Sequence, residues 1–212
     1  MNFEFIADLD EYFCEKYANY DKLCILPGYH MPKMQETRED AFGRRYSYTL
    51  PASTMSLANQ AAKTELLATL KEKLSDKTFS FSFRPLGFFA KISDRFAREN
   101  FRKTLQEVAH GYNVAPASLG SELDISPKVW KKILRGSFYP SKNLIFSLAI
   151  SAHFNYREAK ALLQICGYDF DFTEPRDVVL SYLLYRGVYN QAMVDAALAE
   201  YKLEPLLIKR AD

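Results

Sequence analysis

The residues with the clearest capacity for chemistry lie on one short predicted helix, residues 125–136. Its basic side chains are Lys128, Lys131, Lys132 and Arg135. Their spacing of i, i+3, i+4 and i+7 places all of them on one side of a helix. The apolar residues Val129, Trp130, Ile133 and Leu134 occupy the other side. Such a helix can pack on a core and present positive charge to a phosphate-rich partner.

Both ends of this helix are encoded locally. Ser126 is a suitable N-cap, because its hydroxyl can accept a hydrogen bond from a backbone amide one turn further on. Pro127 follows at the first helical position, where a missing N–H costs nothing. Gly136 is suited to end the helix as a C-terminal cap.

The charge distribution points to the same region. The 212-residue chain has a formal net charge of only +2, which is too small to indicate a nucleic-acid partner by itself. However, residues 125–157 contain no acid, and residues 125–142 contain five bases, which leaves −3 for the rest of the chain. An ordinary solvated helix mixes signs to gain i, i+4 pairs. We therefore expect nucleic-acid contact here rather than a passive surface.

Other kinds of chemistry have little support in the sequence. Cys14, Cys24 and Cys166 are odd in number and lack C-x-x-C spacing, so neither a disulfide framework nor a zinc site is expected. The three histidines, His30, His110 and His153, are isolated from acids and cysteines at ligand spacing. The early acids Asp8, Asp10 and Glu11 are interpreted as complementing a helix dipole rather than binding metal. We expect no enzyme, no cofactor and no metal.

The first residues and the overall hydropathy predict a cytoplasmic protein. The N-terminal stretch carries acids where a signal peptide needs bases. No stretch reaches the roughly 18 uninterrupted apolar residues of a membrane span. We therefore expect no membrane association.

Periodicity predicts a mainly α chain. Predicted helices cover residues 4–19, 53–74, 96–111, 115–125, 125–136, 142–154, 155–166, 174–186 and 189–201. The last two are expected to be amphipathic. Residues 44–51 and 77–89 alternate aromatic and polar side chains and predict two strands that pair with each other, whereas residues 21–45 predict a loop. Gly120 leaves room for a close helix crossing, and Asp124 tolerates a left-handed turn.

Residues 117–149 resemble, as a unit and without gaps, the Xre type of helix-turn-helix domain, the lambda-repressor-like fold of bacterial and phage regulators. The places that carry the resemblance are Ile125 and Ser126, Trp130 and Ile133, Arg135 and Gly136, and Pro140 and Ser141. The likeness covers about residues 96–166. It implies three regions: a small α+β N-terminal module with a short two-stranded sheet at 1–92, an Xre-like helix-turn-helix domain at 93–166, and a helical C-terminal extension at 167–212.

The resemblance also implies site residues. Base-reading places fall on Pro127, Lys128, Lys131 and Lys132, after the N-cap Ser126, while Arg135, Ser137 and Lys142 lie near the phosphates. Two positions depart from the family pattern. The glutamine that often opens the second helix is replaced by the Pro116–Ala117 region. Leu134 stands directly before Arg135 and Gly136, where the family usually has an acidic residue.

Two hypotheses of different class follow. The first is a bacterial DNA-binding transcriptional regulator that docks its basic helix in the major groove, with the N-terminal module or the C-terminal helices forming a homodimer or sensing a signal. The second is a protein-interaction adaptor that uses the helix-turn-helix fold as a scaffold and holds a protein partner through its flanking regions. The sequence does not distinguish DNA from RNA as the nucleic acid.

Overall fold

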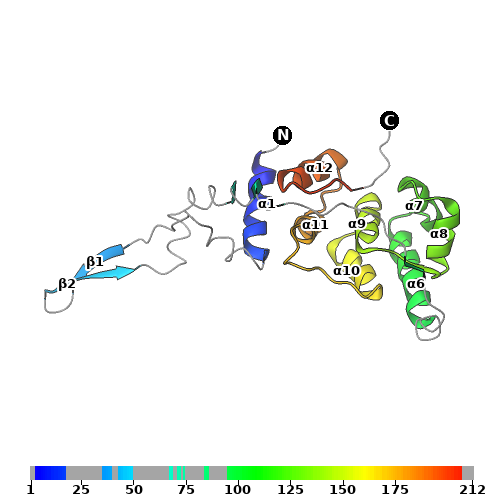
Figure 1. Ribbon diagram of the computed structural model, residues 1–212, viewed down its shortest axis with the longest axis horizontal. Coiled ribbons are helices and arrows are strands. Elements are labelled where there is room, and N and C mark those ends of the chain that lie inside the picture. Colours follow the sequence, from blue (N-terminus) through cyan, green and yellow to red (C-terminus); the bar gives the residue numbers. More distant parts are fainter. Residues whose placement is uncertain are drawn as a thin grey trace. The chain divides into compact units, whose positions relative to one another are not determined.

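The computed structural model describes residues 3–17, 35–39, 43–49, 67–68, 71–72, 74, 84–85 and 95–206 (Figure 1). The described chain is mainly helical. Its helices are α1 (Phe3–Lys16), α6 (Arg95–Gly111), α7 (Pro116–Glu122), α8 (Pro127–Leu134), α9 (Lys142–Ser151), α10 (Tyr156–Ile165), α11 (Pro175–Arg186) and α12 (Gln191–Glu200). Its strands are β1 (Gln35–Glu39), β2 (Arg45–Thr49), β3 (Arg84–Pro85) and β4 (Phe138–Tyr139).

The helices predicted from residue 96 onward are confirmed to within about three residues at each end. Their starts follow the caps expected from the sequence. Ser141 Oγ accepts from the amide of Leu144 at 3.3 Å, and Asn155 with Glu158 forms a complete capping box at the start of α10. Of the helix predicted at 53–74, only residues 67–68 and 71–72 are described as helical, and the remainder lies outside the described residues.

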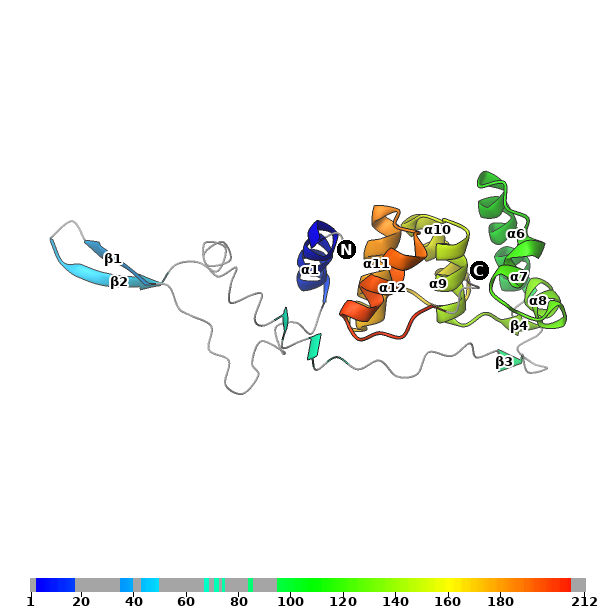
Figure 2. The same cartoon turned by 90° about the horizontal axis from the view of Figure 1, so that it is seen from above.

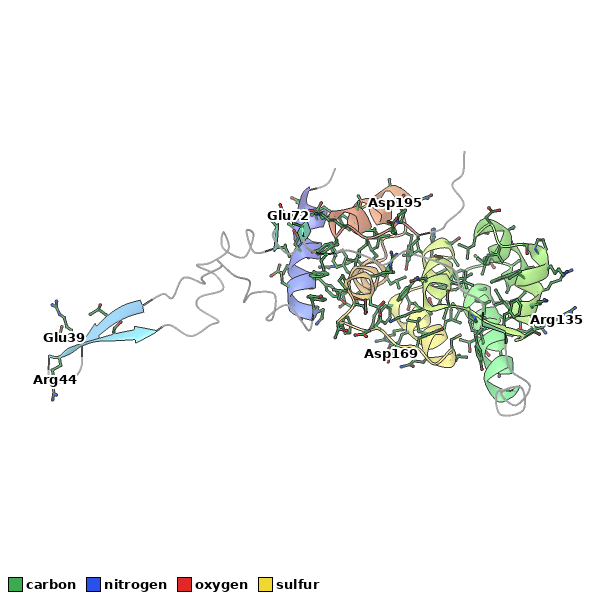
Figure 3. The ribbon with its side chains drawn as sticks, in the orientation of Figure 1. Glu39, Arg44, Glu72, Arg135, Asp169 and Asp195 are labelled. Atoms are coloured by element: carbon green, nitrogen blue, oxygen red, sulfur yellow. The ribbon has the colours of Figure 1, made fainter. Side chains whose placement is uncertain are left out.

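Two compact units divide the chain, one of residues 1–17 and 75–212 and the other of residues 18–74. The described part of the smaller unit includes an antiparallel hairpin of β1 and β2 (Figure 3). Its register places Gln35 opposite Thr49 and Glu39 opposite Arg45. The predicted domain limits at 92 and 166 stay predictions.

The strand predicted at 44–51 forms as β2, but its predicted partner is wrong. β2 pairs with β1, which lies in a stretch predicted to be loop. Gln35–Glu39 has no apolar alternation to indicate a strand, but backbone pairing between strands does not require such alternation. Of the strand predicted at 77–89, only β3 is described, and it pairs antiparallel with β4. That partner, β4, has only two residues and follows α8 directly in the chain.

The core of the larger unit is built on α9 and α11. Every residue from Leu144 to Ile150 in α9 is buried, and so is every residue from Arg176 to Leu184 in α11. The prediction that α11 is amphipathic is therefore wrong, because α1, α9, α10 and α12 cover it on all sides. Leu144, Ile145, Leu148, Ala149 and Ala152 are all buried in this core.

The N-terminal helix α1 lies against α11 and completes this core (Figure 2). Leu9 and Phe13 are fully buried, and the ring of Phe13 stacks on Tyr201 at 4.3 Å between centroids. Asp8 accepts hydrogen bonds from Tyr182 at 2.7 Å and from Arg186 at 2.9 Å. Asp10 accepts from Tyr201 Oη at 2.6 Å. These acids hold α1 in place, beyond the helix-dipole role expected from sequence.

Among the described residues, no helix is both long enough and apolar enough to cross a membrane.

Candidate nucleic-acid interface

The basic helix predicted at 125–136 is α8, and its ends are built as expected. Ser126 Oγ accepts from the amide of Val129 at 3.4 Å, and Pro127 occupies the first helical position. Gly136 adopts φ = 68°, a left-handed conformation that favours glycine, and its amide donates to Ile133 O at 2.8 Å. These local bonds fix where α8 begins and ends.

Buried side chains hold α8 against α7. Trp130 and Ile133 are 4% and 1% exposed, and Trp130 Nε1 donates to Pro116 O at 2.9 Å. The only tryptophan of the chain is therefore part of the core, as expected. Because one indole both packs and forms a hydrogen bond, it fixes the rotation of α8 about its axis.

The turn between α7 and α8 depends on two sequence features that were predicted. Asp124 has φ = 55°, the left-handed conformation that Asp tolerates better than most residues. Gly120 lies directly under Trp130: a Cβ built there would be 2.4 Å from Trp130 Cγ. The close crossing expected at Gly120 is confirmed, and Trp130 is the group that crosses it.

We expect Gly120→Ala to destabilise the fold by about 2 kcal/mol or more, because the new methyl group overlaps the indole of Trp130, which is buried and hydrogen-bonded to Pro116 O. Urea unfolding followed by circular dichroism measures this cost. Gly111→Ala is the matched control: a Cβ there meets nothing within 4 Å. It should leave stability unchanged or raise it by about 0.5 kcal/mol. Equal effects at the two positions would contradict the close packing of Trp130 on α7.

The outer side of α8 presents Lys128, Lys131, Lys132 and Arg135, all exposed, which we call the α8 cationic face. Figure 3 shows Arg135 projecting outward from this helix. Within the part of the chain that the structure describes, none of these four residues takes part in an ion pair. Lys132 Nζ lies 4.9 Å from the centre of the Phe138 ring, which restricts that ammonium more than its neighbours.

The two other residues predicted to lie near phosphates, Ser137 and Lys142, differ in their exposure. Ser137 is exposed directly after α8, and its amide donates to Lys132 O at 2.8 Å. Lys142 is the exception, because its ammonium forms an ion pair with the buried carboxylate of Asp177 on α11. Its side chain is only 24% exposed. The geometry therefore separates Lys142 from the α8 cationic face.

Sequence reasoning missed Arg102 as a site residue. With Gln106, one turn later on α6, Arg102 lines a surface hollow that also includes Lys131 and Arg135. The available signal was the outward i, i+4 spacing of Arg102 and Gln106 next to the basic region. No local pattern shows that α6 and α8 bring these side chains to one hollow.

The described residues show no metal-binding cluster, and the raised pKa of Cys166 disfavours thiolate chemistry at that residue. They contain no group of three or more His, Cys, Asp or Glu side chains placed to hold a metal ion. His153 stacks on Tyr189 at 4.8 Å, and His30 lies outside the described residues. Burial raises the pKa of the Cys166 thiol to about 12, so the reactive thiolate is scarce at neutral pH.

We expect Cys166 in the folded protein to react with iodoacetamide at pH 8 at least about 100-fold more slowly than in the unfolded chain, because its thiolate is depleted. Mass spectrometry of the Cys166 peptide after timed labelling, with and without denaturant, measures the ratio. Equal labelling rates in the two states would contradict the burial of this thiol.

Because the folded-state pKa lies above the unfolded value of 9.0, this thiol also makes stability fall as the pH rises from 9.0 toward about 12.

Comparisons of the chain with known protein families, with curated proteins and with solved structures found no match in any of the three. The functional assignment therefore depends on the residues and their geometry.

Proposed function

We propose that residues 93–166 are an Xre-type helix-turn-helix domain and that the protein is a DNA-binding transcriptional regulator. In this proposal α7 and α8 are the helix-turn-helix pair, and α8 is the recognition helix. The observation that carries it is the α8 cationic face: four exposed cations on one capped helix, none of them in an ion pair within the described part of the chain. A rigid helix with unneutralised charge suits a polyanion that follows its surface.

The proposed docking places the N-terminal half of α8 in the major groove. Lys128 lies in the first turn of α8, where the helix dipole adds positive potential, and Lys131 lies one turn further on, in the last turn of the helix. A lysine can donate to O6 and N7 of guanine, but as a mobile point charge it reads sequence less sharply than arginine. Lys132 and Arg135 then contact phosphates, as does the exposed Ser137 region after α8. We expect strong salt dependence and modest sequence preference.

Lys142 is left out of this contact set because its ammonium is held by Asp177. The packing of α9 on α11 takes this side chain into an ion pair that its position in the sequence does not reveal. The C-terminal helices thus support the proposed domain through α9, and we propose no role for them in contacting DNA.

Selection of bound sequences from mixed DNA and RNA pools at two salt concentrations tests the proposal. The expected result is recovery of duplex DNA, reduced at the higher salt. Enrichment of RNA in place of duplex DNA would mean that the partner is RNA. The adaptor hypothesis would be favoured by two results together. The protein would retain no nucleic acid at low salt, and a pull-down would recover one partner protein in stoichiometric amount, whether or not nuclease is added and whether or not Lys128→Glu is present.

A further inference from the structure

A hollow of about 340 Å³ lies where α6, the start of α7 and the C-terminal half of α8 meet. Its lining residues are Arg102, Gln106, Pro116, Ala117, Lys131, Leu134 and Arg135. The side chains that α7 contributes are short, and Trp130 draws the carbonyl oxygen of Pro116 into a hydrogen bond. The hollow is therefore edged by the longer side chains of α6 and α8.

The charge of this hollow has one sign. Three of its lining side chains are cations, from two different helices, and none is a carboxylate. On the same helix as Arg102, Lys103 is neutralised by Glu107 one turn later, at 3.8 Å. Arg102 has no such pair among the described residues. Cations gathered without a counter-charge repel one another, and an anion between them relieves that repulsion.

The charged hydrogen-bonding groups of the hollow are all donors. The two guanidinium groups and the ammonium are donors without acceptors, and the Gln106 amide can donate as well. Guanidinium forks match two oxygens of a phosphate at once. The volume exceeds what one phosphate group fills, so there is room for the sugar carbons to which a phosphodiester is attached.

We propose that this hollow binds a phosphate group, with Arg102 and Arg135 donating to its oxygens and Lys131 adding charge. This inference rests on the proposed function, in which the phosphate belongs to the DNA backbone beside the groove that α8 enters. Arg102 reaches the duplex from α6, so the contact fixes the angle between α8 and the groove. The same chemistry would also hold a free phosphate or pyrophosphate, and the experiment separates the two sources.

The test compares Arg102→Gln with the matched control Lys103→Gln in the full-length chain. Both remove one positive charge from α6, but Lys103 does not line the hollow. Fluorescence anisotropy with a labelled random duplex, at several salt concentrations, is the first arm. For Arg102→Gln we expect about 5-fold to 10-fold weaker binding and a log–log salt slope smaller in magnitude by about 1. Lys103→Gln should stay within about 2-fold of the wild type.

The second arm measures the rise in thermal midpoint caused by millimolar pyrophosphate. One outcome is that pyrophosphate stabilises the wild type but not Arg102→Gln, while the two proteins bind the duplex with equal affinity. The hollow then binds a free phosphate rather than the DNA backbone. Arg102→Gln indistinguishable from the wild type in both arms overturns the phosphate hollow. If Lys128→Glu still weakens duplex binding in that case, the proposed function survives, whereas a wild type that binds no duplex at low salt refutes the function itself.

Discussion

Reversing two charges, Lys128→Glu with Lys131→Glu, should weaken binding to a random DNA duplex at least about 100-fold at low salt. Both side chains are exposed on the α8 cationic face, and neither is in an ion pair within the described part of the chain. Each substitution removes one attraction to phosphate and adds one repulsion. Fluorescence anisotropy at 25 °C measures the change.

The fold should tolerate this double change. Exposed substitutions away from caps and cores usually alter stability by less than about 0.5 kcal/mol. A glutamate at position 128 also lies in the first turn of α8, where negative charge complements the helix dipole. Far-UV circular dichroism and urea unfolding should therefore match the wild type, which separates lost binding from lost structure.

A matched control reverses two charges elsewhere, Lys160→Glu with Lys202→Glu. These lysines lie on α10 and after α12, outside the α8 cationic face, and the net charge changes by the same amount. Duplex affinity should fall by no more than about 3-fold, through the overall field alone. Equal losses in the two double variants would mean that net charge, rather than α8, governs binding.

Lys142→Ala should lower the free energy of unfolding by about 3 kcal/mol. Its ammonium pairs with Asp177, whose carboxylate is only 5% exposed and also accepts from the Asp171 amide at 2.6 Å. Removing the lysine leaves a buried negative charge without a cation. Urea unfolding of the two proteins at pH 7 measures the difference.

The pH dependence of this variant has a definite sign. Burial already raises the pKa of Asp177 above its ordinary value, against the lowering effects of the Asp171 backbone amide and of Lys142. Without Lys142 that pKa rises further, so the folded variant binds a proton more readily than its unfolded chain. Its deficit should therefore be largest at neutral pH and shrink as the pH falls through the folded-state pKa of Asp177.

Lys160→Ala is the control for this effect. Lys160 pairs with Asp169 at 3.8 Å, but the two side chains are 40% and 51% exposed (Figure 3 labels Asp169). A pair so open to solvent contributes little, so the change should stay within about 0.5 kcal/mol. If Lys142→Ala costs no more than Lys160→Ala, the ion pair with Asp177 does not support the packing of α9 on α11.

The parts of this fold that sequence predicted well are those encoded within a few residues. The Ser126–Pro127 start of α8 and the Asn155–Glu158 capping box are contacts between near neighbours in the chain. The inward position of Trp130 follows from the 3.6-residue period. For these features the local pattern and the final structure obey the same geometric rules.

The parts that sequence could not predict depend on partners distant in the chain or on strands without a pattern. Gln35–Glu39 has no apolar alternation, so β1 gave no signal as the partner of β2. The docking of Asp8 onto Tyr182 joins residues 174 positions apart.

The candidate site shows the same limit. Spacing alone gave the α8 cationic face, but Lys142 was assigned to phosphate because Asp177, 35 residues away, could not be foreseen as its partner. Arg102 was omitted because the hollow it lines exists only once α6, α7 and α8 are assembled.

The salt dependence of duplex binding tests the central claim most directly. Five cations, the α8 cationic face and Arg102, are proposed to face phosphates or bases. If most of them neutralise phosphates, the affinity of the wild type for a random duplex should fall with a log–log slope of about −3 to −4. Lys128→Glu with Lys131→Glu should show no measurable binding over the same range. A wild type that fails to bind duplex at low salt, or binds with a slope near zero, would contradict the proposal that α8 contacts DNA.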